Sequence, residues 1–139
     1  MKKIMIFGDR QSGKTQCMIE QIETCLIESG RHLILSGVDN QKRNILDRIT
    51  NRLDKSGTIV SKLHTGVLKF NNGSLLDVST IGNLSSYRGC RYTTVAIDID
   101  RPLSEWEAVD MEHLLLDTGT LIQTHNTNFG YRVATTVIT

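Results

Sequence analysis

Residues 8–15 of the chain, GDRQSGKT, satisfy the pattern G-x-x-x-x-G-K-[ST] in full. A triphosphate is a dense polyanion, and glycines let several backbone N–H groups converge on it without obstruction by side chains. Such a loop works between a strand and a helix, because the helix N-terminus adds positive potential at the phosphates. Here the apolar run 3–7 precedes the motif, and an amphipathic pattern follows it over residues 13–28. The sequence therefore predicts a phosphate-binding loop in an α/β fold.

Each polar position of this loop has an expected role. Lys14 carries a mobile positive charge that we expect at the β- and γ-phosphates of ATP, and the Thr15 hydroxyl is expected to bind Mg²⁺. ATP and Mg²⁺ are therefore the predicted cofactors. The residues predicted to bind the nucleotide are Gly8, Asp9, Arg10, Gln11, Ser12, Gly13, Lys14 and Thr15.

A second nucleotide-binding signal is the apolar run 95–97, which ends in Asp98. At the carboxyl end of a strand beside the phosphate loop, this carboxylate is expected to hold Mg²⁺ through its water shell. The alternative is a strand that merely ends in a solvated aspartate. The upstream loop favours the metal-binding interpretation.

The rest of the chain alternates between strand and helix patterns. Apolar runs at 32–38, 93–98 and 131–138 predict strands, and apolar stripes predict helices at 40–53 and 104–117. The dipeptide Asn72-Gly73 lies between two strand-like runs, which is typical of a β-hairpin. We therefore expect one P-loop domain over residues 1–139, an α/β fold with a mostly parallel twisted sheet, helices on both faces and an inserted hairpin.

Composition limits where the chain works and what it contacts. No apolar run approaches the roughly 18 residues of a membrane span, and the apolar run after the first lysines is too short for a signal peptide. We expect a cytoplasmic protein without membrane contact. The net charge is only +1, so DNA contact needs a local patch. Arg48, Arg52 and Lys55 share one face of the predicted helix 40–53, either as a DNA surface or as its ordinary solvated side.

Several short motifs occur in an order that resembles a known family. Residues 10–15 match an R-Q-x-G-K-[ST] phosphate loop, residues 68–75 match an apolar-x-F-x-N-G-S stretch, and Arg88-Gly89 precedes the second motif. Helix 40–53, with Gln41 near its start, and the small, threonine-rich residues 134–136 fill two further positions. This order resembles that of large terminase subunits, the DNA-packaging ATPases of tailed phages and herpesviruses, from residue 3 to residue 138.

The resemblance implies further roles and partners. Arg10 would act in cis on the γ-phosphate and neutralise charge that develops during transfer. Thr135 and Thr136 would sense the γ-phosphate, although β-branched residues also simply suit a strand. Double-stranded DNA, a motor or portal protein and further copies of the chain are the implied partners.

The chain departs from the family directly after Asp98. The family places a glutamate there to orient the attacking water, and this chain has Ile99. Asp100 projects to the same side as Asp98 only if the strand continues that far, and Glu105 and Glu107 are other candidate carboxylates. The predicted catalytic residues are Arg10, Asp98 and Asp100. We expect slow hydrolysis that a carboxylate at position 99 would raise.

Three functions remain open from the sequence. The first is the ATPase core of a DNA-packaging motor. The second, which Ile99 favours, is a nucleotide-dependent binding module without efficient hydrolysis. The third is a small P-loop kinase, which is weaker because no arginine-bearing lid is evident. The family's nuclease domain has no counterpart here, so no nuclease activity is expected.

Overall fold

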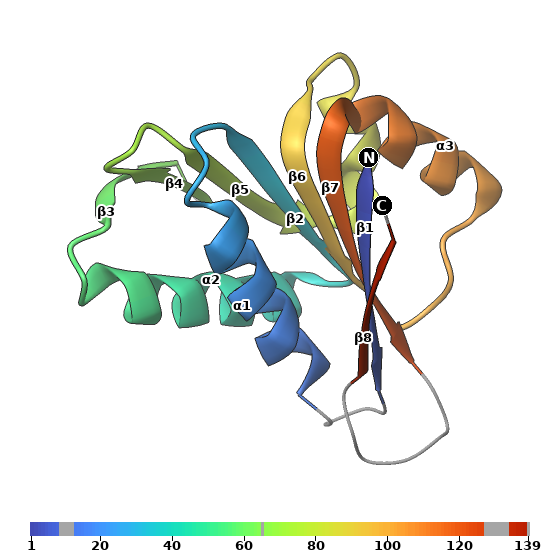
Figure 1. Ribbon diagram of the computed structural model, residues 1–139, viewed down its shortest axis with the longest axis horizontal. Coiled ribbons are helices and arrows are strands. Elements are labelled where there is room, and N and C mark those ends of the chain that lie inside the picture. Colours follow the sequence, from blue (N-terminus) through green and yellow to red (C-terminus); the bar gives the residue numbers. More distant parts are fainter. Residues whose placement is uncertain (9–12, 65, 127–133, 139) are drawn as a thin grey trace.

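The computed structural model describes residues 1–8, 13–64, 66–126 and 134–138 (Figure 1). The strands described form a single eight-stranded sheet in the order β3-β4-β5-β2-β6-β7-β1-β8. The elements are β1 Lys2–Gly8, α1 Lys14–Cys25, β2 Arg31–Ser36, α2 Asp39–Asp54, β3 Ile59–His64, β4 Val67–Phe70, β5 Leu75–Thr80, the 3-10 helix η1 Ile81–Tyr87, β6 Tyr92–Asp98, α3 Glu105–Leu114, β7 Leu115–Asn126 and β8 Ala134–Ile138.

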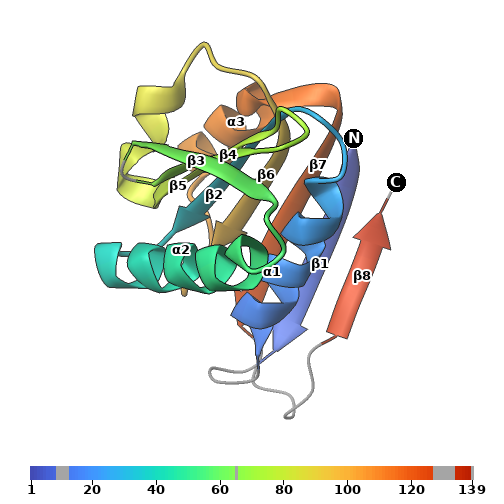
Figure 2. The same ribbon diagram turned by 90° about the vertical axis from the view of Figure 1, so that its left-hand side faces the viewer.

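The centre of the sheet is parallel and its edges are antiparallel. Strands β5, β2, β6, β7 and β1 pair in parallel, whereas β8 runs antiparallel to β1, and β4 runs antiparallel to both β3 and β5. Helices α1 and α2 lie on one face and α3 lies on the other (Figure 2). The predicted α/β class is confirmed, with a mostly parallel sheet and helices on both faces.

Two apolar cores separate the sheet from its helices. Ile34 of β2 and Ala96 of β6 pack toward α1 and α2, and the neighbouring Leu35 and Ile97 pack toward α3. Side chains of a strand alternate between the two faces, so both series of a buried parallel strand are apolar. The same alternation assigns Asp98 to the α1 face and Ile99 to the α3 face.

The predicted hairpin is present between β4 and β5. Gly73 has a φ of 86°, a left-handed conformation that glycine adopts without steric cost. The Asn72 side-chain amide donates to the carbonyls of Leu26 and Ile27 at the end of α1. These bonds fix the hairpin turn against the carboxyl end of the first helix.

The prediction for residues 115–126 was wrong in part. The pattern 104–117 predicted one helix, but α3 ends at Leu114 and the chain continues as strand β7. Gly119 contributes to this course, because a Cβ there would come within 3.1 Å of the Thr93 carbonyl oxygen. The start of α3 agrees with prediction, since Ser104 and Glu107 form a capping box. Strand β3 was also not predicted.

Helix α2 begins after its N-cap Val38, which provides no side-chain hydrogen bond. The described helices are all too short or too polar to cross a membrane.

Candidate nucleotide site

The candidate site lies where the parallel strands end. Ser36 at the end of β2 pairs with Asp98 at the end of β6, and Gly8 at the end of β1 pairs with Asn126 at the end of β7. Helix α1 begins at this same edge of the sheet (Figure 1). Ligands of open α/β sheets bind outside the carboxyl ends of the strands. The geometry therefore places Gly8, the start of α1 and Asp98 at the edge where such ligands bind.

Thr15 and Asp98 are in direct contact at this edge. The Thr15 Oγ1 hydroxyl donates to Asp98 Oδ2 at 2.7 Å, across 83 residues of sequence. Asp98 is only 4% exposed. The structure therefore brings together the two residues that were predicted to hold Mg²⁺.

Two further side chains hold the Asp98 carboxylate. The Thr124 hydroxyl at the end of β7 donates to Asp98 Oδ1 at 2.8 Å, and the Gln41 amide at the start of α2 donates to Oδ2 at 3.0 Å. A buried carboxylate needs such donors, because leaving its oxygens without hydrogen-bond partners costs on the order of 1–3 kcal/mol or more. Sequence reasoning did not assign either residue to the site.

The last glycine of the predicted phosphate loop lies directly before α1. Gly13, immediately before α1, has a φ of 92°, which favours glycine. Lys14 is the first residue of the helix and is buried, with 9% exposure. The predicted binding residues Asp9, Arg10, Gln11 and Ser12 lie outside the described residues.

These residues fit Mg²⁺ and a triphosphate. A hydroxyl and a carboxylate are the hard oxygen ligands that Mg²⁺ prefers. They lie beside the N-terminus of α1, whose N–H groups and dipole favour anions. The buried Lys14 adds a positive charge at the same helix end.

Ile99 belongs to the core on the opposite face of the sheet. It is 4% exposed and packs in the same apolar cluster as Val95, Ile97 and Met111. Position 99 directly follows the last residue of β6, and its side chain packs in the core on the α3 side of the sheet. The sequence-based expectation that a carboxylate at position 99 would raise hydrolysis stays a prediction, and this burial sets the cost in stability that such a substitution carries.

The other candidate carboxylates have different surroundings. Strand β6 ends at Asp98, so it does not continue to carry Asp100, which is exposed. Glu107 is buried and accepts two bonds from Arg101, at 2.7 and 2.9 Å. Arg101, more than any other group, lowers the pKa of Glu107 to about 2. Glu105 is exposed in the first turn of α3.

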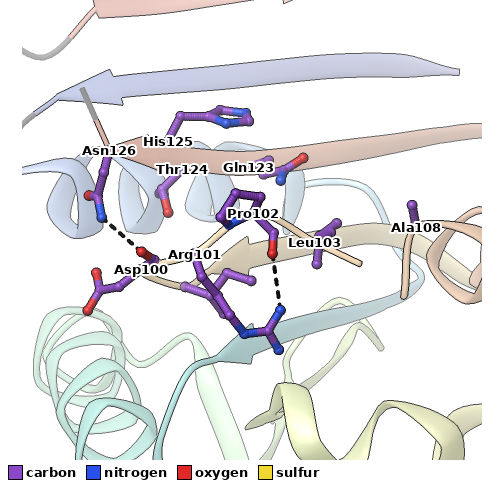
Figure 3. A pocket seen from close by; sticks show the side chains of 10 residues that line it. Asp100, Arg101, Pro102, Leu103, Ala108, Gln123, Thr124, His125 and Asn126 are labelled. Atoms are coloured by element: carbon purple, nitrogen blue, oxygen red, sulfur yellow. Dashed lines mark hydrogen bonds between the residues drawn. The ribbon is translucent and has the colours of Figure 1, made fainter. Parts of the chain in front are cut away.

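A cavity of about 370 Å³ adjoins the site on the α3 side (Figure 3). It lies between the segment that follows β6 and the end of β7, and Asn126 donates to the Asp100 carbonyl across it at 3.3 Å. His125 stacks on Phe7 with ring centroids 5.1 Å apart, and burial lowers the pKa of His125. The cavity is lined by Ile99, Asp100, Arg101, Pro102, Leu103, Ala108, Gln123, Thr124, His125 and Asn126.

The predicted γ-phosphate sensors lie on β8. In its pairing with β1, Thr135 lies opposite Ile6, and Thr136 lies opposite Met5 and is exposed. Strand β7 lies between β1 and β6, and its Thr124 contacts Asp98. In the described structure, the strand residue whose side chain contacts Asp98 is therefore Thr124 of β7.

The predicted DNA face of α2 is partly engaged within the molecule. Arg52 forms an ion pair with Glu23 of α1, and Arg48 donates to Gln16 of α1 at 2.6 Å. These two side chains help to hold α2 on α1. Arg43 of the same helix and Lys55, which directly follows it, are exposed.

A parallel sheet whose first strand leads through a glycine into a helix, with an aspartate at the end of the strand next but one in the sheet, is typical of the P-loop NTPase fold. No protein-family model and no curated protein matches the sequence. Among solved structures, the chain has the fold of phage large terminase ATPase domains.

The ATPase domain of the Thermus phage P74-26 large terminase superposes with a TM-score of 0.59 at 18% identity, covering 93% of this chain. An arginine-to-alanine mutant of that domain gives 0.59 at 15% identity and 92% coverage. The large terminase of a thermophilic bacteriophage gives 0.62 at 12% identity, covering 88% of this chain and 32% of its own. The present chain spans 61% of the length of the two P74-26 domains.

Proposed function

We propose that residues 1–139 form one P-loop domain that binds ATP with Mg²⁺ and hydrolyses it slowly, as the ATPase core of a DNA-packaging motor. The observation that carries the proposal is the contact between Thr15 and Asp98, which joins the two nucleotide motifs across the sheet. The similarity in fold to large terminase ATPase domains supports the motor context.

The roles of the residues follow from their positions. Lys14 binds the β- and γ-phosphates, together with the backbone N–H groups of residues 8–15. Thr15 and Asp98 hold Mg²⁺, which neutralises charge on the phosphates when bound. Thr124 and Gln41 keep the Asp98 carboxylate in place. Arg10, within the loop, acts on the γ-phosphate.

The partners in this proposal follow from the same fold similarity. The proposed partners are DNA, a motor or portal protein, and further copies of the chain. Arg43 of α2 and Lys55, which directly follows the helix, are exposed cations with which the chain would contact DNA phosphates. The salt dependence of such binding follows the number of phosphates neutralised.

A nucleotide-dependent binding module is the second candidate. The observation that favours it is the burial of Ile99 in the apolar core, which leaves the usual glutamate position without a polar group. Phosphate release separates the candidates. A motor is stimulated by DNA, a binding module releases no phosphate, and a kinase requires an acceptor.

The proposed function is tested first by nucleotide titration with Mg²⁺. Lys14→Ala removes a charge-assisted contact worth on the order of 1.5–3 kcal/mol, so we expect ATP affinity to fall by about 10- to 150-fold. Lys69→Ala is the matched control, because Lys69 is an exposed lysine on β4, away from the site. Equal ATP affinity of the wild type and Lys14→Ala would contradict the proposal.

A further inference from the structure

We propose that Gln41 binds and orients the water that attacks ATP, a role that the residue after Asp98 does not fill in this chain. The inference rests on the proposed ATPase function and names the residue on which its chemistry depends. It arises from a side chain that contacts the magnesium aspartate and whose amide keeps a further N–H and a further lone pair for a ligand.

The fold delivers Gln41 to the site through β2. This strand pairs with β6 in parallel, and Ser36 lies opposite Asp98. Helix α2 begins three residues after β2 ends, so its first turn lies beside the Asp98 carboxylate. Gln41 is half-buried in this first turn.

Both ends of the Gln41 amide are held. Its Nε2 donates to Asp98 Oδ2 at 3.0 Å, and its Oε1 accepts the backbone N–H of Gly37 at 3.0 Å. A Cβ at position 37 would lie 3.2 Å from that Oε1, so glycine leaves the amide the space it occupies. An amide that is already oriented loses little further rotamer entropy when it binds a ligand.

The two oxygens of Asp98 identify the side on which Gln41 lies. Oδ1 accepts from Thr124, whereas Oδ2 accepts from both Gln41 and Thr15. Thr15 belongs to the phosphate motif, so Oδ2 is the oxygen turned toward the proposed Mg²⁺. The Gln41 amide therefore lies on the metal and phosphate side of Asp98.

A glutamine has the chemistry that orienting a water requires. Its carbonyl oxygen has two lone pairs and its nitrogen has two N–H donors, so it can accept from a water while donating to another group. In some P-loop GTPases a glutamine holds the attacking water in this way. An amide does not accept a proton at neutral pH, which agrees with slow rather than fast hydrolysis.

The reaction itself needs no other reagent. The water oxygen forms a bond to the γ-phosphorus while the bond from that phosphorus to the β–γ bridging oxygen breaks. The bonding electron pair leaves with ADP, and the water proton passes to a phosphate oxygen or to solvent. Gln41 only fixes the position of the water, and positioning supplies much of the catalysis in phosphoryl transfer.

The other polar side chains near the site are less suited. Glu107 is occupied by Arg101, and Asp100 follows the end of β6. Asn126 carries an amide at the end of β7, and its Nδ2 donates to the Asp100 carbonyl at 3.3 Å. Asn126 is therefore the competitor that the experiment has to separate from Gln41.

The experiment compares Gln41→Ala, Gln41→Met and Asn126→Ala with the wild type. Methionine keeps the length of the side chain without its amide. Asn51→Ala is the matched control, since Asn51 is an exposed amide on the same helix. Thermal unfolding first establishes that each variant is folded. ATP turnover is then measured, together with affinity for ADP–Mg²⁺ plus fluoroaluminate, which mimics the transferring phosphoryl group, and for ADP–Mg²⁺ plus beryllium fluoride, which mimics bound ATP.

We expect both Gln41 variants to lower kcat by about 100-fold with little change in KM. Affinity for the fluoroaluminate complex falls by a similar factor, because it includes the in-line water position, while affinity for the beryllium fluoride complex stays at the wild-type value. This second readout applies even where turnover is very slow.

Three results would overturn the role of Gln41. The first is an equal loss of affinity for both analogue complexes in the Gln41 variants, which would mean that Gln41 only braces Asp98. The second is no loss of affinity for either complex. The third is a selective loss of affinity in Asn126→Ala that Gln41→Ala does not share. Normal ATP binding by the wild type alongside any of these leaves the proposed function intact. Absence of ATP binding by the wild type would instead overturn the proposed function and this inference together.

Discussion

Thr15 and Asp98 are joined by a hydrogen bond of 2.7 Å although 83 residues separate them in sequence. The bond joins the first turn of α1 to the end of β6, and β7 lies between β6 and β1, the strand that precedes α1. The order of the strands therefore brings the two nucleotide motifs into contact.

The first prediction concerns the Mg²⁺ dependence of nucleotide binding. Thr15→Val keeps the shape of the side chain but removes its oxygen, and Asp98→Asn removes the carboxylate charge. We expect each variant to bind ATP in EDTA about as the wild type does, but to lose most of the gain in affinity that Mg²⁺ gives. Isothermal titration with and without Mg²⁺ measures that difference. A gain as large as that of the wild type in both variants would exclude these residues as metal ligands.

The second prediction concerns Thr124. Thr124→Val leaves Asp98 Oδ1 without the hydroxyl donor at 2.8 Å, while the β-branched shape that suits a strand is kept. We expect the free energy of unfolding to fall by about 1–3 kcal/mol, the usual cost of an unsatisfied buried acceptor. Thr120→Val on the same face of β7 is the control, with an expected change within about 0.5 kcal/mol. Equal effects in urea unfolding would show that Asp98 does not depend on Thr124.

The third prediction concerns Ile99. Ile99→Glu places a carboxylate in the apolar core between the sheet and α3, where Ile99 is 4% exposed. We expect a loss of unfolding free energy of about 3 kcal/mol or more. Asp100→Ala, at an exposed position, is expected to change stability by less than about 0.5 kcal/mol. An Ile99→Glu variant as stable as the wild type would contradict this burial, and phosphate release by the folded variant tests the expectation drawn from the sequence.

The parts of the site that the sequence predicted are those encoded by short local patterns. The glycine-rich loop ending in Lys14 and Thr15 needs only a strand before it and a helix after it, and the apolar run before Asp98 needs only to be a strand. Both local conditions are visible in the order of residues. Ile99 is also explained locally, because alternation along β6 places it with Ile97 in the opposite core.

Gln41 and Thr124 were not assigned to the site because their positions depend on register between distant strands. Gln41 was noted only as part of the family-like order of motifs, and no local pattern assigns it to the nucleotide site. Its contact with Asp98 follows from the pairing of β2 with β6. Thr124 was missed because residues 114–116 are consecutive leucines that continue the helix pattern, and Asp117 and Gly119 are uncommon in strands. Tertiary pairing overrides both local signals in β7.

The last prediction concerns the pH dependence of stability through Glu107. Arg101 and the Ser104 cap lower the pKa of this buried carboxyl from 4.5 to about 2. Because the folded pKa is the depressed one, the stabilisation is complete above about pH 4.5 and is lost as the pH falls toward about 2. Glu107→Gln lacks the charge but keeps the side-chain length, so we expect it to be less stable than the wild type at pH 6 by about 1–2 kcal/mol. The two proteins should become equally stable as the pH approaches 2, in urea unfolding measured at each pH. Glu105→Gln, at an exposed position of the same turn, controls for the general effect of removing a charge near the helix N-terminus. A gap between wild type and Glu107→Gln that stays constant from pH 6 to about pH 2.5 would contradict the lowered pKa.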